Sequence, residues 1–426
     1  MKKLSQKRQV LLGAVFGVFI VGGYLGLSFL PSETYSADSN QSATAEKVLL
    51  GGTGIAQNNM GEKNTEAPQK AIHLQTPKPM RAIYMTQCVA GTPSWRDRMA
   101  KMVDETELNS MVVDIKDYSG TIAFRSENPA LKENDGKGCR ASDMREFVSS
   151  LHEKNIYVIG RITVFQDPYY TKAHPELAVK RKSDGGVWHD RKGLAFIDVG
   201  ARPFWDYIIE LSKESYTLGF DELNFDYIRF PSDGDMKDID FTHSRGKTKP
   251  EALREFFEYL NFALKSTGVV MSADLFGMTT TNTDDLNIGQ VLENTLPYFD
   301  YIYPMVYPSH YPTGFNGWKD VNAHPYDIVK FSLDRAVVRT KATTTTIKLY
   351  GSEIVSMATG TKPTLYSKPA FSPDKIRPWL QDFDYPVTYT EAMVKAQIQA
   401  TYDAGLDSWL MWDPGNKYTA GVYKAE

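Results

Sequence analysis

Strand-like and helix-like segments alternate along nearly all of the chain after residue 80, and this alternation restricts its fold more than any other feature. Eight apolar runs have the length of strands, and amphipathic helical stretches separate them. The runs cover residues 82–88, 110–116, 156–165, 222–230, 269–276, 301–307, 376–383 and 408–412. Open sheets usually have fewer strands, so the pattern predicts an α/β fold, a (β/α)8 TIM-type barrel with insertions.

Five connecting helices follow from apolar periodicity. They are expected at residues 94–106, 142–154, 203–218, 250–266 and 390–404. Two connections are unusually long: residues 167–199 follow the third strand, and the Thr-, Ser- and Pro-rich residues 341–374 precede the seventh. Loops that follow barrel strands carry specificity, so the first insertion is expected beside the site. The second precedes its strand and is expected on the outer or bottom surface.

The fourth strand has an unusual polar face. In residues 221–231, Glu222, Asn224 and Asp226 alternate with apolar and aromatic residues, and a strand turns successive side chains to opposite faces. In a parallel sheet covered on both faces, unpaired carboxylates are costly to bury. The pattern favours a functional site, with a structural ion pair to Arg229 as the alternative.

Charged and aromatic residues also gather at the other strand ends, where TIM barrels place their chemistry. The candidate substrate contacts are Asp114, Arg161, Arg229, Tyr303, Tyr307, His310, Gln381, Asp382 and Trp412. Several have a structural alternative: Asp382 can shape a turn, and Arg161 can neutralise buried carboxylates. Tyr303 and Tyr307 can fill the barrel, and His310 can be a solvated loop residue. Their coincidence at nearly every strand end favours one shared site.

Paired carboxylates beside aromatic rings suit the cleavage of glycosidic bonds. One acid protonates the leaving oxygen while the other attacks the anomeric carbon or activates water, and the rings hold the sugar's apolar face. Asp226 and Asp274, on neighbouring strands, are the predicted catalytic pair, and either can be the acid. Glu222 lies deeper in its strand and is expected to tune Asp226 by like charge and hydrogen bonding.

Other chemistries lack their signatures. The chain has no Gly-rich phosphate loop and no Gly-x-Ser-x-Gly elbow, and its 7 histidines do not form a ligand-like cluster. A net charge of −4 gives no basic excess for nucleic acid. We therefore expect no cofactor, no metal and no nucleic-acid partner. Metal-assisted hydrolysis or lyase chemistry on the same barrel is a lesser alternative.

The N-terminus predicts a membrane anchor. Basic residues at positions 2, 3, 7 and 8 precede an uncharged apolar run over residues 10–30, which is long enough to cross a bilayer. The expected order is a basic stub and signal anchor over residues 1–31, a flexible low-complexity linker over 32–79, and an extracytoplasmic barrel over 80–420. A cleaved signal peptide is the alternative.

The chain has 2 cysteines, Cys88 and Cys139. In an exported domain they can pair, and two spaced cysteines make no metal motif. A disulfide and two unreactive thiols both remain open at this point.

Five motifs carry a family resemblance. They are DELNFDYIRFP at residues 221–231, SADLFG at 272–277, YIYPMVYPSHY at 301–311, RPWLQDF at 377–383 and WLMW at 409–412. With these in order, residues 81–414 resemble an uncharacterised bacterial family of glycoside hydrolase domains. The resemblance implies a TIM barrel and carbohydrate hydrolysis, but it supplies no catalytic residues. Asn224 stands where that family more often has Gln, and the Thr-rich insertion exceeds the family's connection.

These observations together predict a membrane-anchored, extracytoplasmic glycoside hydrolase whose substrate is a cell-surface or extracellular polysaccharide. A barrel that binds glycan without cutting it is the alternative. The two differ in geometry, because a hydrolase needs two carboxyl groups about 5–10 Å apart across an open cleft.

Overall fold

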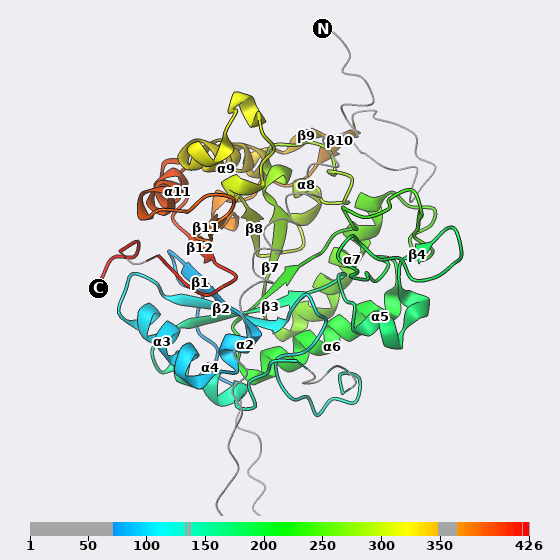
Figure 1. Ribbon diagram of the computed structural model, residues 1–426, viewed down its shortest axis with the longest axis horizontal. Helices are drawn as coiled ribbons and strands as arrows, with labels where there is room; N and C mark the ends of the chain where they lie inside the picture. Colours follow the sequence, from blue (N-terminus) through cyan, green and yellow to red (C-terminus); the bar gives the residue numbers. More distant parts are fainter. Residues whose placement is uncertain (1–70, 133, 135–137, 348–363, 420, 426) are drawn as a thin grey trace, which may run out of the picture.

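The computed structural model of the chain describes residues 71–132, 134, 138–347, 364–419 and 421–425. Eight parallel strands close into one barrel, and each pairs with the next barrel strand along the chain (Figure 1). They are β1 (Arg81–Met85), β2 (Ser110–Lys116), β3 (Tyr157–Thr163), β5 (Glu222–Asp226), β7 (Val270–Phe276), β8 (Tyr301–Met305), β11 (Trp379–Gln381) and β12 (Trp409–Trp412). Because β12 pairs back with β1, the predicted TIM-type barrel is confirmed, and each predicted run contains most or all of one strand.

Helices surround the barrel (Figure 1). The main ones are α3 (Pro93–Asp104), α4 (Met144–His152), α6 (Arg202–Leu218), α7 (Lys249–Leu264), α9 (Pro325–Lys341) and α11 (Glu391–Asp403). All except α9 were predicted, with boundaries within two residues of those expected. Local sequence explains two of these boundaries. Gly219 ends α6 with a φ of 117°, and Thr248 and Glu251 form a capping box that starts α7.

Barrel side chains alternate between the interior and the helices. Outward residues such as Val113 and Phe225 join the large core beneath the helices. Inward residues form a separate buried cluster that includes Ala82, Tyr84, Val112, Tyr157, Ile159, Tyr303, Tyr307, Trp379 and Leu410. The barrel is therefore filled by side chains, many of them aromatic, and the acids of β5 and β7 extend from the same inward faces.

A short segment before β1 packs across the amino-terminal end of the barrel. The Leu74 amide donates to the Asp221 carboxylate at 2.6 Å, and the Thr76 and Tyr157 hydroxyls lie 3.1 Å apart. Asp221 and Tyr157 stand at the starts of β5 and β3. Residues 71–79, the end of the predicted linker, therefore contact the barrel opposite the carboxyl ends of its strands.

The predicted anchor over residues 10–30 lies outside the described residues. Within the ranges that the structure does describe, none of the helices is both long enough and apolar enough to cross a bilayer.

Both predicted insertions carry small sheets. The first contains α5 (Tyr170–Ala173) and β4 (Lys180–Arg181), and β4 pairs with β6 (Ile239–Asp240) from the loop after β5. It therefore lies beside the carboxyl ends of β3 and β5. The second begins where α9 ends and holds β9 (Thr344–Ile347) and β10 (Thr364–Ser367), which pair as antiparallel strands.

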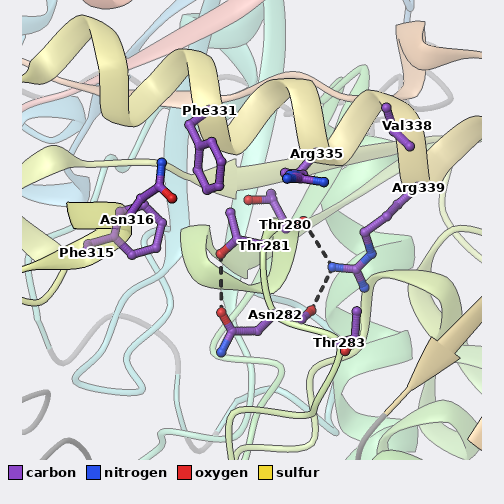
Figure 2. Close-up of a pocket in the computed structure, with 10 residues that line it drawn as sticks. All are labelled: Thr280, Thr281, Asn282, Thr283, Phe315, Asn316, Phe331, Arg335, Val338 and Arg339. Atoms are coloured by element: carbon purple, nitrogen blue, oxygen red, sulfur yellow. Dashed lines mark hydrogen bonds between the residues drawn. The ribbon is translucent and has the colours of Figure 1, made fainter. Parts of the chain in front are cut away.

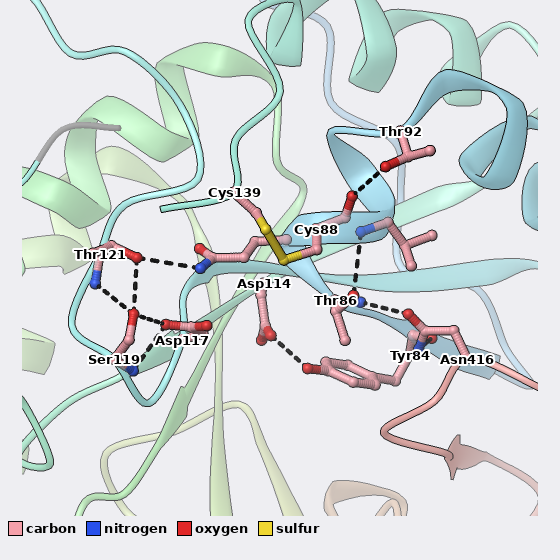
Figure 3. The surroundings of a disulfide bond; sticks show 12 residues. Tyr84, Thr86, Cys88, Thr92, Asp114, Asp117, Ser119, Thr121, Cys139 and Asn416 are labelled. Carbon is pink, nitrogen blue, oxygen red and sulfur yellow. Dashed lines mark hydrogen bonds between the residues drawn. A yellow bond between two sulfur atoms is a disulfide. The ribbon is translucent and has the colours of Figure 1, made fainter. Parts of the chain in front are cut away.

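A disulfide joins Cys88 and Cys139, which answers the question that the sequence left open. Cys88 lies in the short α2 (Gln87–Ala90) after β1, and Cys139 lies in the loop between β2 and α4. Figure 3 shows the bond among the loops above Asp114, where the Gln87 amide donates to the Thr121 hydroxyl at 3.2 Å. The disulfide thus fixes two neighbouring loops at the carboxyl end of the barrel.

Candidate active site

Three carboxylates from three strands surround one guanidinium at the carboxyl end of the barrel. Arg161 donates from Nη1 to Asp114 Oδ1 at 2.7 Å and from Nη2 to Asp226 Oδ2, and its Nε lies 3.8 Å from Asp274 Oδ2. All four residues are buried; Asp226 is 6 % exposed and Asp274 only 1 %. Buried carboxylates need a counter-charge, and Arg161 supplies it for the whole cluster.

Strand pairing sets Asp226 and Asp274 side by side. The β5–β7 register aligns Phe225 with Ala273, so the next residue on each strand is the acid. Neighbouring strands lie about 4.8 Å apart, and both side chains point inward. Both acids also reach the same guanidinium, so their carboxyl groups lie close together on the inner face of the barrel.

Aromatic rings enclose the cluster from β1, β11 and β12. The Tyr84 hydroxyl donates to Asp114 Oδ2, and its ring stacks on Trp412 with centroids 3.8 Å apart. The Arg161 guanidinium lies 4.9 Å from the Trp412 ring centroid, and the Trp379 indole N–H donates to Asp274 Oδ1 at 2.9 Å. The rings hold Arg161 and Asp274 in fixed positions and exclude water from around them.

Burial shifts the proton equilibria of two of the acids. It raises the pKa of Asp114 to about 6, against the opposing effect of Arg161. Burial, followed by the charge of Asp226, raises the pKa of Asp274 well above its usual range. Arg161 and the hydrogen bonds from Asn224 and Trp379 oppose this shift only in part. Its environment therefore favours the protonated form of Asp274, next to a carboxylate that Arg161 contacts directly.

The backbone turns sharply just after Asp226. Tyr227 has a φ of 51°, a left-handed conformation that is costly for a bulky side chain, and its amide donates to Asp226 Oδ1. The half-buried Tyr227 ring lies 5.0 Å from the Arg229 guanidinium. Arg229 itself donates to Phe230 O at 3.1 Å. The ion pair between Arg229 and the strand's acids, which was the structural alternative to a functional site, is not formed, and Arg161 contacts Asp226 instead.

Comparison with known protein families identifies the family of the barrel. A family model described as "Putative glycosyl hydrolase domain" matches residues 82–418, which is almost the entire barrel. The chain belongs to this family. Its barrel is thus a glycosyl hydrolase domain, as the sequence motifs predicted.

Solved structures resemble the glycosyl hydrolase domain in fold. The glycoside hydrolase domain of PgaB (BpsB) from Bordetella bronchiseptica matches 79% of this chain and 94% of that one, with 12% identity and a TM-score of 0.52. A hypothetical protein from Ruminiclostridium thermocellum matches 45% of this chain and 96% of that one, with 37% identity and a TM-score of 0.41. No curated protein matches the sequence.

Glu222 lies at the opposite end of the same strand from Asp226. It is fully buried and accepts hydrogen bonds from the hydroxyls of Tyr157, at 3.1 Å, and Tyr303. Arg377 Nη1 lies 3.8 Å from its carboxylate. Burial raises the pKa of Glu222. The charge of Arg377 and the hydrogen bonds that Glu222 accepts oppose this shift. The partners of Glu222 therefore form a second polar cluster near the bottom of the barrel, and Tyr303 belongs to that cluster.

Tyr307 and His310 lie nearer the acids. After burial, the charges of Asp274 and Asp226 contribute most to raising the pKa of the Tyr307 phenol, so Tyr307 lies near both acids. The His310 ring lies 5.4 Å from the Tyr307 ring and 5.8 Å from that of Phe383. Burial lowers the pKa of His310 to about 4, so it is a neutral ring in an aromatic setting.

Gln381 and Asp382 hold loops at the rim of the glycosyl hydrolase domain. The Gln381 side chain accepts from the amide and the hydroxyl of Ser309 and donates to Phe383 O at 3.0 Å. Asp382 accepts from the amide of Thr419 at 2.9 Å and from its hydroxyl. Both residues are more than 95 % buried by internal partners. For Asp382 this agrees with the structural alternative given above, in which it shapes a turn.

Sequence reasoning missed Tyr84 and Trp379 as parts of the site. Both point into the barrel, where Tyr84 contacts Asp114 and Trp379 contacts Asp274. Strand alternation was the available signal: Tyr84 follows the inward Ala82 by two residues, and Trp379 precedes Gln381 by two. In the described part of the chain, no group of three or more His, Cys, Asp or Glu residues is arranged to hold a metal ion. Arg161 occupies the space between the three aspartates.

Proposed function

We propose that this glycosyl hydrolase domain cleaves a cell-surface or extracellular polysaccharide with Asp226 and Asp274 as its catalytic pair. The observation that carries the proposal is their placement, side by side on β5 and β7 and in reach of one guanidinium. Tyr307 and Trp412 would face the sugar at the rim of the same cluster.

The two acids differ in a way that assigns their roles. Burial and the charge of Asp226 raise the pKa of Asp274, which suits Asp274 to serve as the acid that protonates the leaving oxygen. Asp226 accepts hydrogen bonds from Arg161 and from the Tyr227 amide, so it serves as the carboxylate that acts at the anomeric carbon or on water. Asp114 and Arg161 do not react; they contribute the charges next to the catalytic pair, because Arg161 contacts both Asp114 and Asp226.

The test is the release of reducing ends from a panel of polysaccharides by the full-length protein. Asp226→Asn and Asp274→Asn should each lower turnover by about 10²–10⁴-fold, because each removes one half of the acid–base pair. Asp240→Asn, in the surface strand β6 and paired with Arg245, is the matched control and should leave turnover unchanged. Unaltered turnover in Asp226→Asn would refute the assignment of Asp226 as a catalytic residue.

The expected location of this activity is outside the cytoplasm, with the chain held by a single-pass N-terminal anchor. The basic N-terminus before an apolar run supports this, and so does the disulfide, since such bonds persist in oxidising compartments. Protease digestion of intact cells should remove the barrel while its anchor stays with the membrane. A barrel protected until the cells are lysed would contradict the proposal.

One observation favours the second candidate function, a barrel that binds glycan without cutting it. Asp274 is 1 % exposed, and its Oδ1 accepts from both Asn224 and Trp379 at 2.9 Å. A proton donor must reach the glycosidic oxygen, so catalysis requires these contacts to open when substrate binds. Glycan binding by the wild type without release of reducing ends would establish the binding function instead.

A further inference from the structure

A cavity of about 400 Å³ lies beside the barrel, apart from the Arg161 cluster (Figure 2). It is lined by Thr280, Thr281, Asn282, Thr283, Phe315, Asn316, Phe331, Arg335, Val338 and Arg339. Two walls come from the loops that follow β7 and β8, and the third is α9. The cavity is thus connected through two loops to the strands that carry Asp274 and Tyr303, and its volume is in the usual range of small-molecule sites.

The cavity carries one uncompensated positive charge. Its lining includes no Asp or Glu and two arginines. Arg339 is neutralised by Glu293 through two contacts, at 2.8 and 2.6 Å, and also donates to Asn282 O at 2.7 Å. Arg335 is exposed and, within the described residues, makes no hydrogen bond or ion pair; its guanidinium lies 5.3 Å from the Phe331 ring centroid. A free, planar guanidinium on an aromatic ring suits a carboxylate.

The rest of the lining suits a sugar ring. Phe315 and Phe331 are half-buried, with centroids 5.8 Å apart, and present apolar faces on which a pyranose can stack. The amides of Asn282 and Asn316 and the hydroxyls of threonines offer donors and acceptors for sugar hydroxyls. Figure 2 shows these side chains converging on the cavity from both loops and from α9.

We propose that this cavity is a second saccharide site, selective for a sugar unit that bears a carboxylate. Arg335 binds the carboxylate, and the ring of Phe331 supports both the guanidinium and the sugar. The proposal goes beyond the hydrolytic function, because binding here requires neither Asp226 nor Asp274. On a polymer, the site would hold an acidic unit away from the bond being cut.

The test compares two ligands that differ only at C6, methyl β-D-glucuronide and methyl β-D-glucoside. Dissociation constants are measured by saturation-transfer NMR titration on the full-length Asp226→Asn protein, so that hydrolysis does not interfere. The glucuronide should bind about tenfold more tightly than the glucoside, and salt at about 0.5 M should reduce that preference because it screens an exposed charge.

Arg335→Gln should remove the preference while leaving the melting temperature unchanged, because Arg335 is exposed. Arg254→Gln, an exposed arginine on α7, is the matched control and should keep it. Phe331→Leu should weaken both ligands together. Equal binding of the two ligands, or a preference that survives Arg335→Gln, would overturn the proposal. Neither outcome depends on whether the wild type releases reducing ends.

Discussion

Removing Arg161 should destabilise the fold in a pH-dependent way. Arg161→Met keeps the length and apolar stem of the side chain but leaves Asp114 and Asp226 without the guanidinium that both contact. These carboxylates are 2 % and 6 % exposed, so water cannot take its place. Removal of one partner from a buried ion pair typically costs about 3–5 kcal/mol.

The pH dependence follows from Asp114. Burial already raises its pKa to about 6 in the folded state, and loss of Arg161 raises that pKa further. The folded variant then binds protons that the unfolded chain, with a carboxyl pKa of about 3.9, does not bind. The wild type shares the same unfolded chain, so the penalty relative to the wild type is greatest above the folded pKa of Asp114 in the variant and narrows as the pH falls toward about 6, the folded pKa in the wild type.

Thermal unfolding measures both effects. For a domain of this size, 3–5 kcal/mol corresponds to a fall in melting temperature of roughly 4–7 °C at about pH 8, and the gap from wild type should narrow toward about pH 5. Arg245→Met is the matched control: Arg245 pairs with Asp240, and their side chains are 68% and 23% exposed, so its loss should cost about 1 kcal/mol or less. A gap for Arg161→Met no larger than the control's, or one independent of pH, would refute the reasoning.

Three further predictions concern the loops around the site. Cys88→Ser removes a cross-link between residues 51 apart, and the chain-entropy model predicts that this lowers the free energy of unfolding by about 4 kcal/mol. An unchanged melting temperature would contradict a structural role for the disulfide. Tyr227→Val should lower turnover more than Tyr227→Gly. Glycine tolerates a φ of 51° and so keeps the backbone amide of residue 227 on Asp226, whereas a β-branched residue does not. Equal losses of turnover in the two variants would show that the Tyr227 ring, and not the backbone conformation, is required. Burial lowers the pKa of His310 to about 4, so it stays neutral from about pH 5 to 8 and His310→Gln should leave the acid limb of the pH–activity profile in place. A displaced limb in that variant would assign the titration to His310 after all.

The barrel could be predicted because its signal is periodic. Each strand is an apolar run of fixed length, and β5 and β7 could be recognised as neighbours from their order alone. The pairing of Asp226 with Asp274 follows from that order and from the polar face of the fourth strand. Periodicity gives the face on which a side chain lies, and both acids lie on the inner one.

Position along the barrel axis was harder to judge. Glu222 and Asp226 share a face but are four residues apart, which is about 13 Å along a strand. Glu222 therefore meets Tyr157, Tyr303 and Arg377 at the bottom of the barrel, beyond reach of the upper acids. The central role of Arg161 depends on its strand neighbours: β2 and β5 pair with β3 on either side and bring Asp114 and Asp226 to it, and β7 with Asp274 lies beyond β5. Strand order could have placed these residues near one another, but the sharing of one guanidinium by three carboxylates depends on side-chain reach and rotamers, which leave no periodic mark in the sequence.

The contacts of Leu74 and Thr76 at the starts of β5 and β3 fix where the chain enters the barrel. Whatever precedes residue 71 joins the barrel at the end opposite Asp226 and Asp274. A tether that leaves from that end, as proposed for the anchored protein, does not have to pass the carboxyl ends of the strands. A long polymer could therefore approach the candidate site without meeting the chain that holds the domain.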